Sequence, residues 1–130
     1  MREFKRGEIY LARLDSAVGS EQYGDRPVLI LQNDIGNYYS PTTIVAPLTS
    51  RKKKLYLPCH VPITLSGRDY GIAVLEQIRT IDKRRLTEYI GRVSQNEMAA
   101  INYATIISLG LIPLTQPWKG ATHERTSCNG

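Results

Sequence analysis

The sequence predicts a mainly β (α+β) fold: a small antiparallel β-barrel with one amphipathic helix near its C-terminal end. Short runs of β-branched and aliphatic residues, each bounded by Gly, Pro, Asn or Asp, fill the first two thirds of the chain. A segment of helical period follows them. With 130 residues, 42% of them apolar, the chain fits one domain with its own core. We expect this domain to span residues 1–112 and a flexible tail to span residues 113–130.

The expected strands occur at the close spacing that is typical of a small barrel. The fourth run contains Pro58 and Pro62, which cannot donate ladder hydrogen bonds, so we expect it at an edge of the sheet. The fifth run has the pattern of a central strand. In order, the runs are Glu8–Leu14, Val28–Gln32, Thr43–Leu48, Leu55–Ile63 and Ile72–Arg79.

A capping box predicts where the C-terminal helix begins. The Ser94 side chain can accept a hydrogen bond from the backbone at Glu97, and the Glu97 side chain can reach back to Ser94. Gly110 supplies a left-handed stop, so we expect a helix over Gln95–Leu109 that packs on the barrel. Its apolar stripe consists of Met98, Ile101, Ala104 and Ile107. A shorter helix is expected over Lys83–Tyr89, capped by Asp82.

Composition favours a cytoplasmic protein that binds a polyanion. The net charge of +5 and the pI near 9.4 favour a polyanion but do not identify one. Cys59 and Cys128 lie in very different contexts, so we expect no disulfide framework and a reducing compartment. The charged N-terminus leads directly into a strand pattern, and we expect neither a signal peptide nor a membrane span.

Two polar clusters on apolar strands are the strongest functional signal. Arg26 opens one expected strand and Thr49 closes the next, so antiparallel pairing would bring both side chains to the same end of the sheet. A guanidinium and a hydroxyl there would form a phosphate-sized site, with Glu21 on the preceding loop as a proton acceptor. The basic run Arg51–Lys54 follows directly, either as part of this site or as a solvated hairpin loop.

The chemistry that is absent from the sequence narrows the choice of reaction. The chain has no Gly-rich phosphate loop, no Cys-x-x-Cys, no His-Glu-x-x-His and no Gly-x-Ser-x-Gly. His60 and His123 are too few and too far apart for a histidine-rich metal site, and His60 is expected to be a partly exposed edge residue. We therefore expect no metal and no cofactor. A reaction at the Arg26 and Thr49 site would therefore have to proceed without a metal and without a histidine pair.

Three separated segments resemble the MazF/PemK family of bacterial toxin endoribonucleases. They are Gly7–Tyr10, Arg26–Ile30 and Glu76–Asp82, and the resemblance runs from about Arg6 to Leu111. It implies an SH3-like, MazF/CcdB-like barrel and a homodimer in the bacterial cytoplasm. It also implies a toxin of a type II toxin–antitoxin system that cleaves single-stranded mRNA at selected sequences, leaves 2′,3′-cyclic phosphate and 5′-hydroxyl ends, and is blocked by a cognate acidic antitoxin.

The family resemblance also implies roles for individual residues. Arg26 and Thr49 match the essential Arg and Thr of the family and are the expected catalytic pair, with proton delivery by Arg26 left open. Glu21 is the candidate base, although it could instead orient Arg26 or contact a nucleobase. The expected RNA-binding residues are Ser20, Gln22, Asn33, Ser50, Lys52, Lys53 and Gln77.

Some alternatives stay open on the sequence. Gln77 and Arg79 alternate with Glu76 and Ile78, so they share a face and either contact RNA or form salt bridges with the barrel. A related barrel family poisons a topoisomerase without cleaving RNA, and a plain nucleic-acid-binding module is a third possibility. The Arg26 and Thr49 pair discriminates, because a non-catalytic binder has no reason to keep it.

Overall fold

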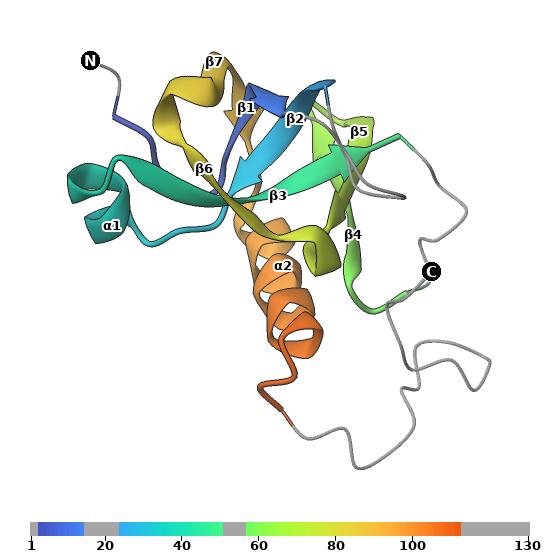
Figure 1. Cartoon of the computed structure of the whole chain (residues 1–130). Helices are drawn as coiled ribbons and strands as arrows, with labels where there is room; N and C mark the ends of the chain where they lie inside the picture. Colours follow the sequence, from blue (N-terminus) through green and yellow to red (C-terminus); the bar gives the residue numbers. More distant parts are fainter. Residues whose placement is uncertain (1–2, 15–23, 51–56, 113–130) are drawn as a thin grey trace.

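The computed structural model describes residues 3–14, 24–50 and 57–112. Figure 1 shows a twisted sheet with a long helix packed against it and a short helix at one side. The segments η1 and η2 are single 3-10 turns. In chain order the elements are β1 (Glu8–Leu14), β2 (Gly24–Ile30), α1 (Asp34–Tyr39), β3 (Thr42–Thr49), β4 (His60–Leu65), β5 (Arg68–Val74), η1 (Leu75–Gln77), β6 (Arg79–Asp82), η2 (Lys83–Arg85), β7 (Leu86–Arg92) and α2 (Gln95–Ser108).

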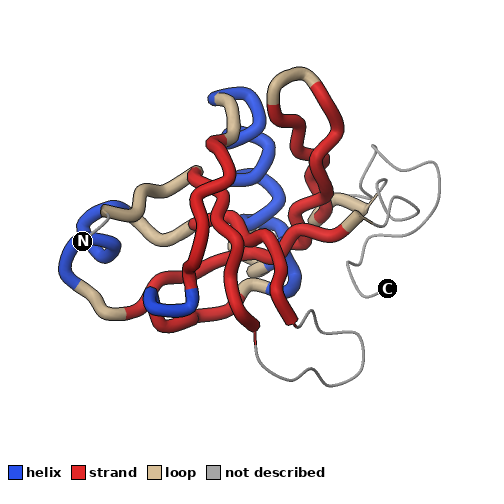
Figure 2. The backbone as a smooth tube through the Cα atoms, turned by 90° about the horizontal axis from the view of Figure 1, so that it is seen from above, coloured by secondary structure: helices blue, strands red, loops and turns tan. Residues whose placement is uncertain are grey.

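The strands form one antiparallel sheet in the order β4-β5-β3-β2-β1-β7, and β6 pairs with β3 beside this path. The predicted mainly β fold with a C-terminal helix is confirmed. Within the described ranges the end strands β4 and β7 do not pair, so the sheet does not close into a complete barrel. The hairpin of β4 and β5 and the helix α1 lie on opposite sides of the molecule, as both Figure 1 and Figure 2 show.

Alternation along the central strands buries both faces of the sheet. One face of β1, β2 and β3 packs against α2 through residues such as Ile9, Leu29 and Leu48. The other face forms a second, smaller core, whose buried members are Tyr10, Ala12, Leu14, Val28, Ile30, Val45 and Ile81. We call this second side of the sheet the β6 face, because β6 covers part of it through Ile81.

Helix α2 begins and ends where local sequence chemistry predicts. The Ser94 hydroxyl accepts a hydrogen bond from Glu97 N at 3.1 Å, and a Glu97 carboxylate oxygen accepts one from Ser94 N at 2.9 Å. Gly110 follows the helix with φ +69°. The apolar stripe of α2 is buried at Ile101, Ala104 and Ile107 and partly buried at Met98. The prediction of this helix is confirmed.

The expected strand Ile72–Arg79 is wrong, because η1 divides it. The strand β5 pairs with the end of β3 and β6 pairs with its beginning, and the ladder register shifts by three residues between them, which is the length of η1. The 3-10 turn therefore takes up the residues that one continuous strand could not pair. Gln77 consequently belongs to this turn, and the expected alternation from Glu76 through Arg79 does not hold.

Two further expectations about helices differ from the structure. Asp82 caps a helical turn as expected, by accepting a hydrogen bond from Arg84 N, but the turn stops at Arg85. The residues that follow form β7 and pair with β1, since ladder bonding to a neighbouring strand outweighs local helix propensity. Asp34–Tyr39 form the helix α1, capped by Asn33, at a place where no helix is predicted above. None of the helices in the described ranges is long and apolar enough to cross a membrane.

Candidate active site

Arg26 lies near the start of β2 with part of its guanidinium buried. It shares the β6 face with Val28 and Ile30, which are alternate residues of the same strand. Its Nε is buried and finds no hydrogen-bond partner among the residues that the structure describes. The neighbouring Asp25 lies on the opposite face of β2, where its carboxylate is 3.8 Å from Arg13 Nε. A buried donor without a partner is a rare and costly feature, which points to a bound anion.

Thr49 ends β3 on the same face as Arg26. The β2–β3 ladder pairs Val28 with Pro47, and the same antiparallel register, continued by two residues, sets Arg26 opposite Thr49. The ladder stops before this pair, because the end of β3 turns to β5, where Thr49 pairs with Ile72, while β2 stays paired with β1. The sheet therefore splits between the two residues, as Figure 1 shows at the right-hand end of β3.

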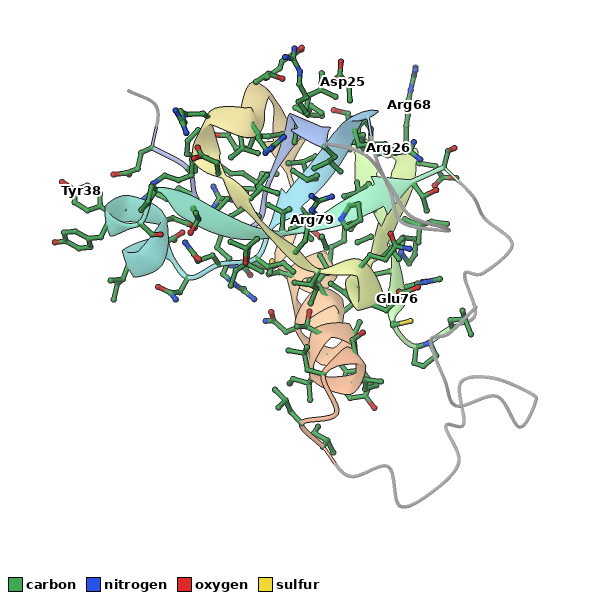
Figure 3. The ribbon with its side chains drawn as sticks, in the orientation of Figure 1. Asp25, Arg26, Tyr38, Arg68, Glu76 and Arg79 are labelled. Carbon is green, nitrogen blue, oxygen red and sulfur yellow. The ribbon has the colours of Figure 1, made fainter. Side chains whose placement is uncertain are left out.

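A second cation lies on the same face. Arg79 of β6 pairs with Val45, which belongs to the smaller core, so its side chain projects from the β6 face. Within the described part of the chain the side chain of Arg79 makes no hydrogen bond and no ion pair. Val45, the ladder partner of Arg79, is four residues from Thr49 on β3, which corresponds to roughly 13 Å at about 3.3 Å per residue. Figure 3 shows Arg26 on β2 and Arg79 where β6 crosses β3.

The structure places the other expected site residues unequally. Ser50 is exposed and follows Thr49 directly, so it adjoins the pair. Gln77 is half-buried at the end of η1. Asn33 lies beyond the opposite end of β2 from Arg26, where its side chain accepts a hydrogen bond from Gly36 N at 2.8 Å. Five others lie outside the described residues, namely Ser20, Glu21, Gln22, Lys52 and Lys53.

His60 differs from its prediction, because it is buried rather than partly exposed. It begins the edge strand β4 with 8% of its surface accessible, and its Nε2 lies 2.9 and 3.0 Å from the carboxylate oxygens of Glu76. The ligand atoms of His60, Glu76 and Cys59 lie within 4.8 Å of one another. Cys59 is disulfide-bonded, contrary to the sequence expectation, so its sulfur is not available as a thiolate ligand. This cluster consequently does not constitute a metal site.

The geometry supports chemistry on a phosphate. The planar guanidinium group of an arginine can donate two parallel hydrogen bonds to two phosphate oxygens, and it stays charged at any physiological pH. A threonine hydroxyl can donate one further hydrogen bond. Strand alternation and the β2–β3 register set these two groups on one face, and Arg79 extends the positive charge along it. The arrangement suits a polyanionic chain that lies across the β6 face.

Sequence reasoning missed the residues that line a hollow next to the end of β3. Tyr70, Ile72 and Pro62 line a hollow beside Ser50, and no motif in the sequence marks them. The register of β3 with β5 is what brings them there. The sequence would have indicated these residues only if the three-residue register shift at η1, which sets how β5 pairs with β3, had been recognised.

Comparison with known proteins agrees with this geometry. Residues 5–109 match the family described as PemK-like, MazF-like toxin of type II toxin-antitoxin system. The chain is 50% identical over 113 residues to the endoribonuclease EndoA of Bacillus subtilis, covering 83% of this chain and 96% of that protein.

Solved structures show the same fold. A mycobacterial endoribonuclease in complex with its cognate antitoxin has a TM-score of 0.71 and 29% identity, and the match covers 83% of this chain and 96% of that chain. The crystal structure of MazF from Deinococcus radiodurans has a TM-score of 0.74 and 24% identity, and the match covers 85% of this chain and 99% of that chain. The chain belongs to the PemK-like, MazF-like toxin family of type II toxin–antitoxin systems.

Proposed function

We propose that this chain, a MazF-like toxin endoribonuclease of a toxin–antitoxin system, cleaves single-stranded mRNA at selected sequences without a metal ion. The observation that carries the proposal is the Arg26 and Thr49 pair at the split of the sheet, with a buried guanidinium nitrogen that has no partner among the described residues. Cleavage of cellular mRNA would arrest growth.

The reaction follows from the chemistry of RNA. The substrate 2′-oxygen attacks the adjacent phosphorus and loses its proton to a base, while the bond from phosphorus to the 5′-oxygen breaks and that oxygen takes up a proton. The products are a 2′,3′-cyclic phosphate and a 5′-hydroxyl. Arg26 stabilises the charge that develops on the non-bridging oxygens, and Thr49 donates a hydrogen bond to one of them. Ser50, which follows Thr49 directly, would assist it.

Proton transfer is the least defined part of the mechanism. Arg26 has a side-chain pKa above about 12 and is therefore a weak general acid. We propose Glu21, which precedes β2 in the sequence, as the base that accepts the 2′-hydroxyl proton. Glu21 lies outside the described residues, so this role rests on the family resemblance.

The remaining RNA contacts are proposed along the β6 face and its flanking loops. Arg79 would hold a phosphate at a distance from the scissile one. The other proposed contacts are Ser20, Gln22, Asn33, Ser50, Lys52, Lys53 and Gln77. Basic residues would supply affinity, whereas loop shape and base stacking would select the sequence.

We propose three further properties on the same basis. A mycobacterial relative is solved with its cognate antitoxin, which supports an acidic antitoxin as the partner of this chain. Its binding over the basic RNA-binding face would exclude RNA. The chain would act as a homodimer in the bacterial cytoplasm, and residues 113–130 would form a tail outside the toxin domain.

The alternative of a topoisomerase poison is not favoured. Relatives that are 50% identical over most of the chain are named endoribonucleases, and the chain keeps the arginine and the hydroxyl that the cleavage reaction needs. A poison has no use for a phosphate site on this face.

Purified protein incubated with a long mRNA in chelator tests the proposal. We expect discrete fragments with 5′-hydroxyl ends, and we expect Arg26→Ala to lose this cleavage. A substrate in which the nucleotide on the 5′ side of the cut has a 2′-deoxyribose should not be cleaved, because it lacks the attacking hydroxyl. Intact RNA in the presence of a stalled topoisomerase complex would instead support the poison.

A further inference from the structure

A hollow of about 310 Å³ adjoins the Thr49 side of the proposed site, because Ser50 and Ile72, the ladder partner of Thr49, both line it. Its lining includes Ser50, the residue after Thr49, together with Tyr70 and Ile72 of β5 and Pro62 of β4. Apart from Ser50, none of the residues that line this space has a role in the proposed cleavage mechanism. A built hollow next to a reaction centre is a candidate subsite for part of the substrate.

The strand register connects the hollow to the reaction centre. Thr49 pairs with Ile72, and Ile72 pairs with Pro62, so these three residues form a row across β3, β5 and β4. Residues that pair directly in a sheet project from the same face, which is also the face of Arg26. Tyr70 lies at a register shift of the β4–β5 ladder, between the paired residues Asp69 and Gly71, and lines the same hollow. The hollow therefore continues the β6 face past the scissile phosphate.

The lining is suited to a flat, neutral group rather than to a second phosphate. Tyr70 has 37% of its surface exposed and offers an aromatic ring, and Ile72 and Pro62 are apolar. The partial burial of Tyr70, together with the negative charge of Glu88, raises the pKa of its phenol, so the ring is neutral at physiological pH. Asp69 adds a carboxylate to the wall, which disfavours an anion.

We propose that this hollow binds one nucleobase of the substrate, next to the scissile phosphate, and that Tyr70 and Asp69 determine which base is accepted. Tyr70 stacks on the base. A carboxylate only accepts hydrogen bonds and has about four lone-pair sites, so Asp69 can take a further donor beyond its present partner. It favours adenine, cytosine or guanine, which donate from an exocyclic amino group, over uracil, whose N3–H donor lies between two carbonyl oxygens that repel a carboxylate. This inference rests on the proposed endoribonuclease function and adds a subsite to it.

The test is the distribution of cleavage sites, obtained by sequencing the 5′ ends of the products from a long mRNA. For Tyr70→Ala we expect kcat/KM to fall about tenfold, which corresponds to the usual loss of one base stack, and selectivity to weaken at a single nucleotide position. Tyr70→Phe keeps the aromatic ring and should therefore keep both the wild-type kcat/KM and the wild-type selectivity. Asp69→Asn, whose amide can also donate, should admit uracil at that same position.

The control is Tyr38→Ala, because Tyr38 is an exposed tyrosine of α1 on the opposite side of the molecule and should change neither rate nor selectivity. Unchanged selectivity in both Tyr70→Ala and Asp69→Asn, with wild-type cleavage intact, would overturn the subsite and leave the proposed function standing. Absence of cleavage by the wild-type protein would instead refute the endoribonuclease function on which the subsite depends. Matching thermal denaturation curves for the variants would show that the fold is retained.

Discussion

Arg26 and Thr49 lie on opposite sides of the split where β3 leaves β2 and begins to pair with β5. The ladder register aligns them, but the ladder itself ends at Val28 and Pro47. Each residue is still paired on its other side, Arg26 with Ala12 and Thr49 with Ile72. The ladder between β2 and β3 is open at this point, and alternation leaves both polar side chains on one face. We infer that the topology of β3, which pairs with different strands at its two ends, creates the active site.

The first prediction concerns the balance between stability and activity at Arg26. Its buried Nε has no partner in the described residues, and leaving a donor unsatisfied in this way costs about 1–3 kcal/mol. Arg26→Met keeps similar length and removes the donor. We expect the free energy of unfolding in urea to rise by about 1 kcal/mol and RNA cleavage to fall by about 10²- to 10³-fold.

Arg26→Lys is the matched variant for this prediction. It keeps the positive charge but loses the planar fork, so binding to RNA should change little while cleavage drops. If Arg26→Met were less stable than the wild-type protein, the guanidinium would have a partner that supports the fold, and its assignment as an anion-binding group would be wrong.

The second prediction separates the hydroxyl of Thr49 from its shape. Thr49 lies at the end of β3 with 9% of its surface exposed. Replacement by Val puts a methyl group in the place of the hydroxyl and keeps the shape of the side chain. We expect Thr49→Val to lower kcat about tenfold to a hundredfold, with KM nearly unchanged, because the lost hydrogen bond strengthens in the transition state. Thr49→Ser should retain most of the activity. Equal rates for Val and Ser in single-turnover assays would contradict a donor role.

Local signals in the sequence were sufficient where an element is specified by its own residues. The capping box of Ser94 and Glu97 and the glycine stop at Gly110 determine α2 within one segment, and both are present. The apolar stripe through Ile101 follows from the same helical period. Helix length and position were therefore predictable without any knowledge of the sheet.

Non-local pairing explains the failures. Strand β5 ends at Val74 because η1 absorbs a three-residue register shift between two partners of β3, and no local pattern encodes that shift. Residues after Arg85 form β7 because β1 is available as a neighbour. His60 is buried because Glu76, sixteen residues away, pairs with it.

The site was predictable only in part for the same reason. Alternation along two strands, together with antiparallel pairing, is enough to bring Arg26 and Thr49 to one sheet end. Placing Arg79 and Tyr70 on the same face requires the registers of β6 and β5 with β3, which are tertiary information.

The third prediction concerns Arg79 as a phosphate contact. Its guanidinium has no ion pair within the described ranges and projects from the β6 face. Each phosphate contact on single-stranded RNA contributes about 0.7 to the slope of log binding constant against log salt concentration. We expect Arg79→Gln to reduce this slope by about that amount and to weaken binding similarly for all sequences. Arg84→Gln is a control, because Arg84 is already paired with Asp82. A change in the cleaved sequence would argue for base contact instead.

The fourth prediction rests on Glu97, which connects α2 to the sheet. One carboxylate oxygen accepts a hydrogen bond from Ser94 N, and the other accepts bonds from Thr64 N at 2.7 Å and from the Thr64 hydroxyl at 3.1 Å. Burial acts to raise the pKa of Glu97, but the hydrogen bonds from Ser94 and Thr64 outweigh it, so the pKa is lowered. The charged form of Glu97 is therefore the form that stabilises the folded protein.

A carboxyl group whose pKa is lower in the folded state contributes its full stability above its unfolded pKa, about 4.3 for Glu, and loses it as the pH falls through the folded value. Glu97→Gln should thus lower the free energy of unfolding by about 1–2 kcal/mol at pH 7, because Gln keeps one neutral acceptor oxygen and its amide nitrogen cannot accept the hydrogen bonds on the other side. The two proteins should converge in stability as the pH falls from about 5 toward 3, because Glu97 is then protonated. Urea denaturation at both ends of this range measures the difference. A gap that stayed constant with pH would mean that shape, rather than charge, makes Glu97 stabilising.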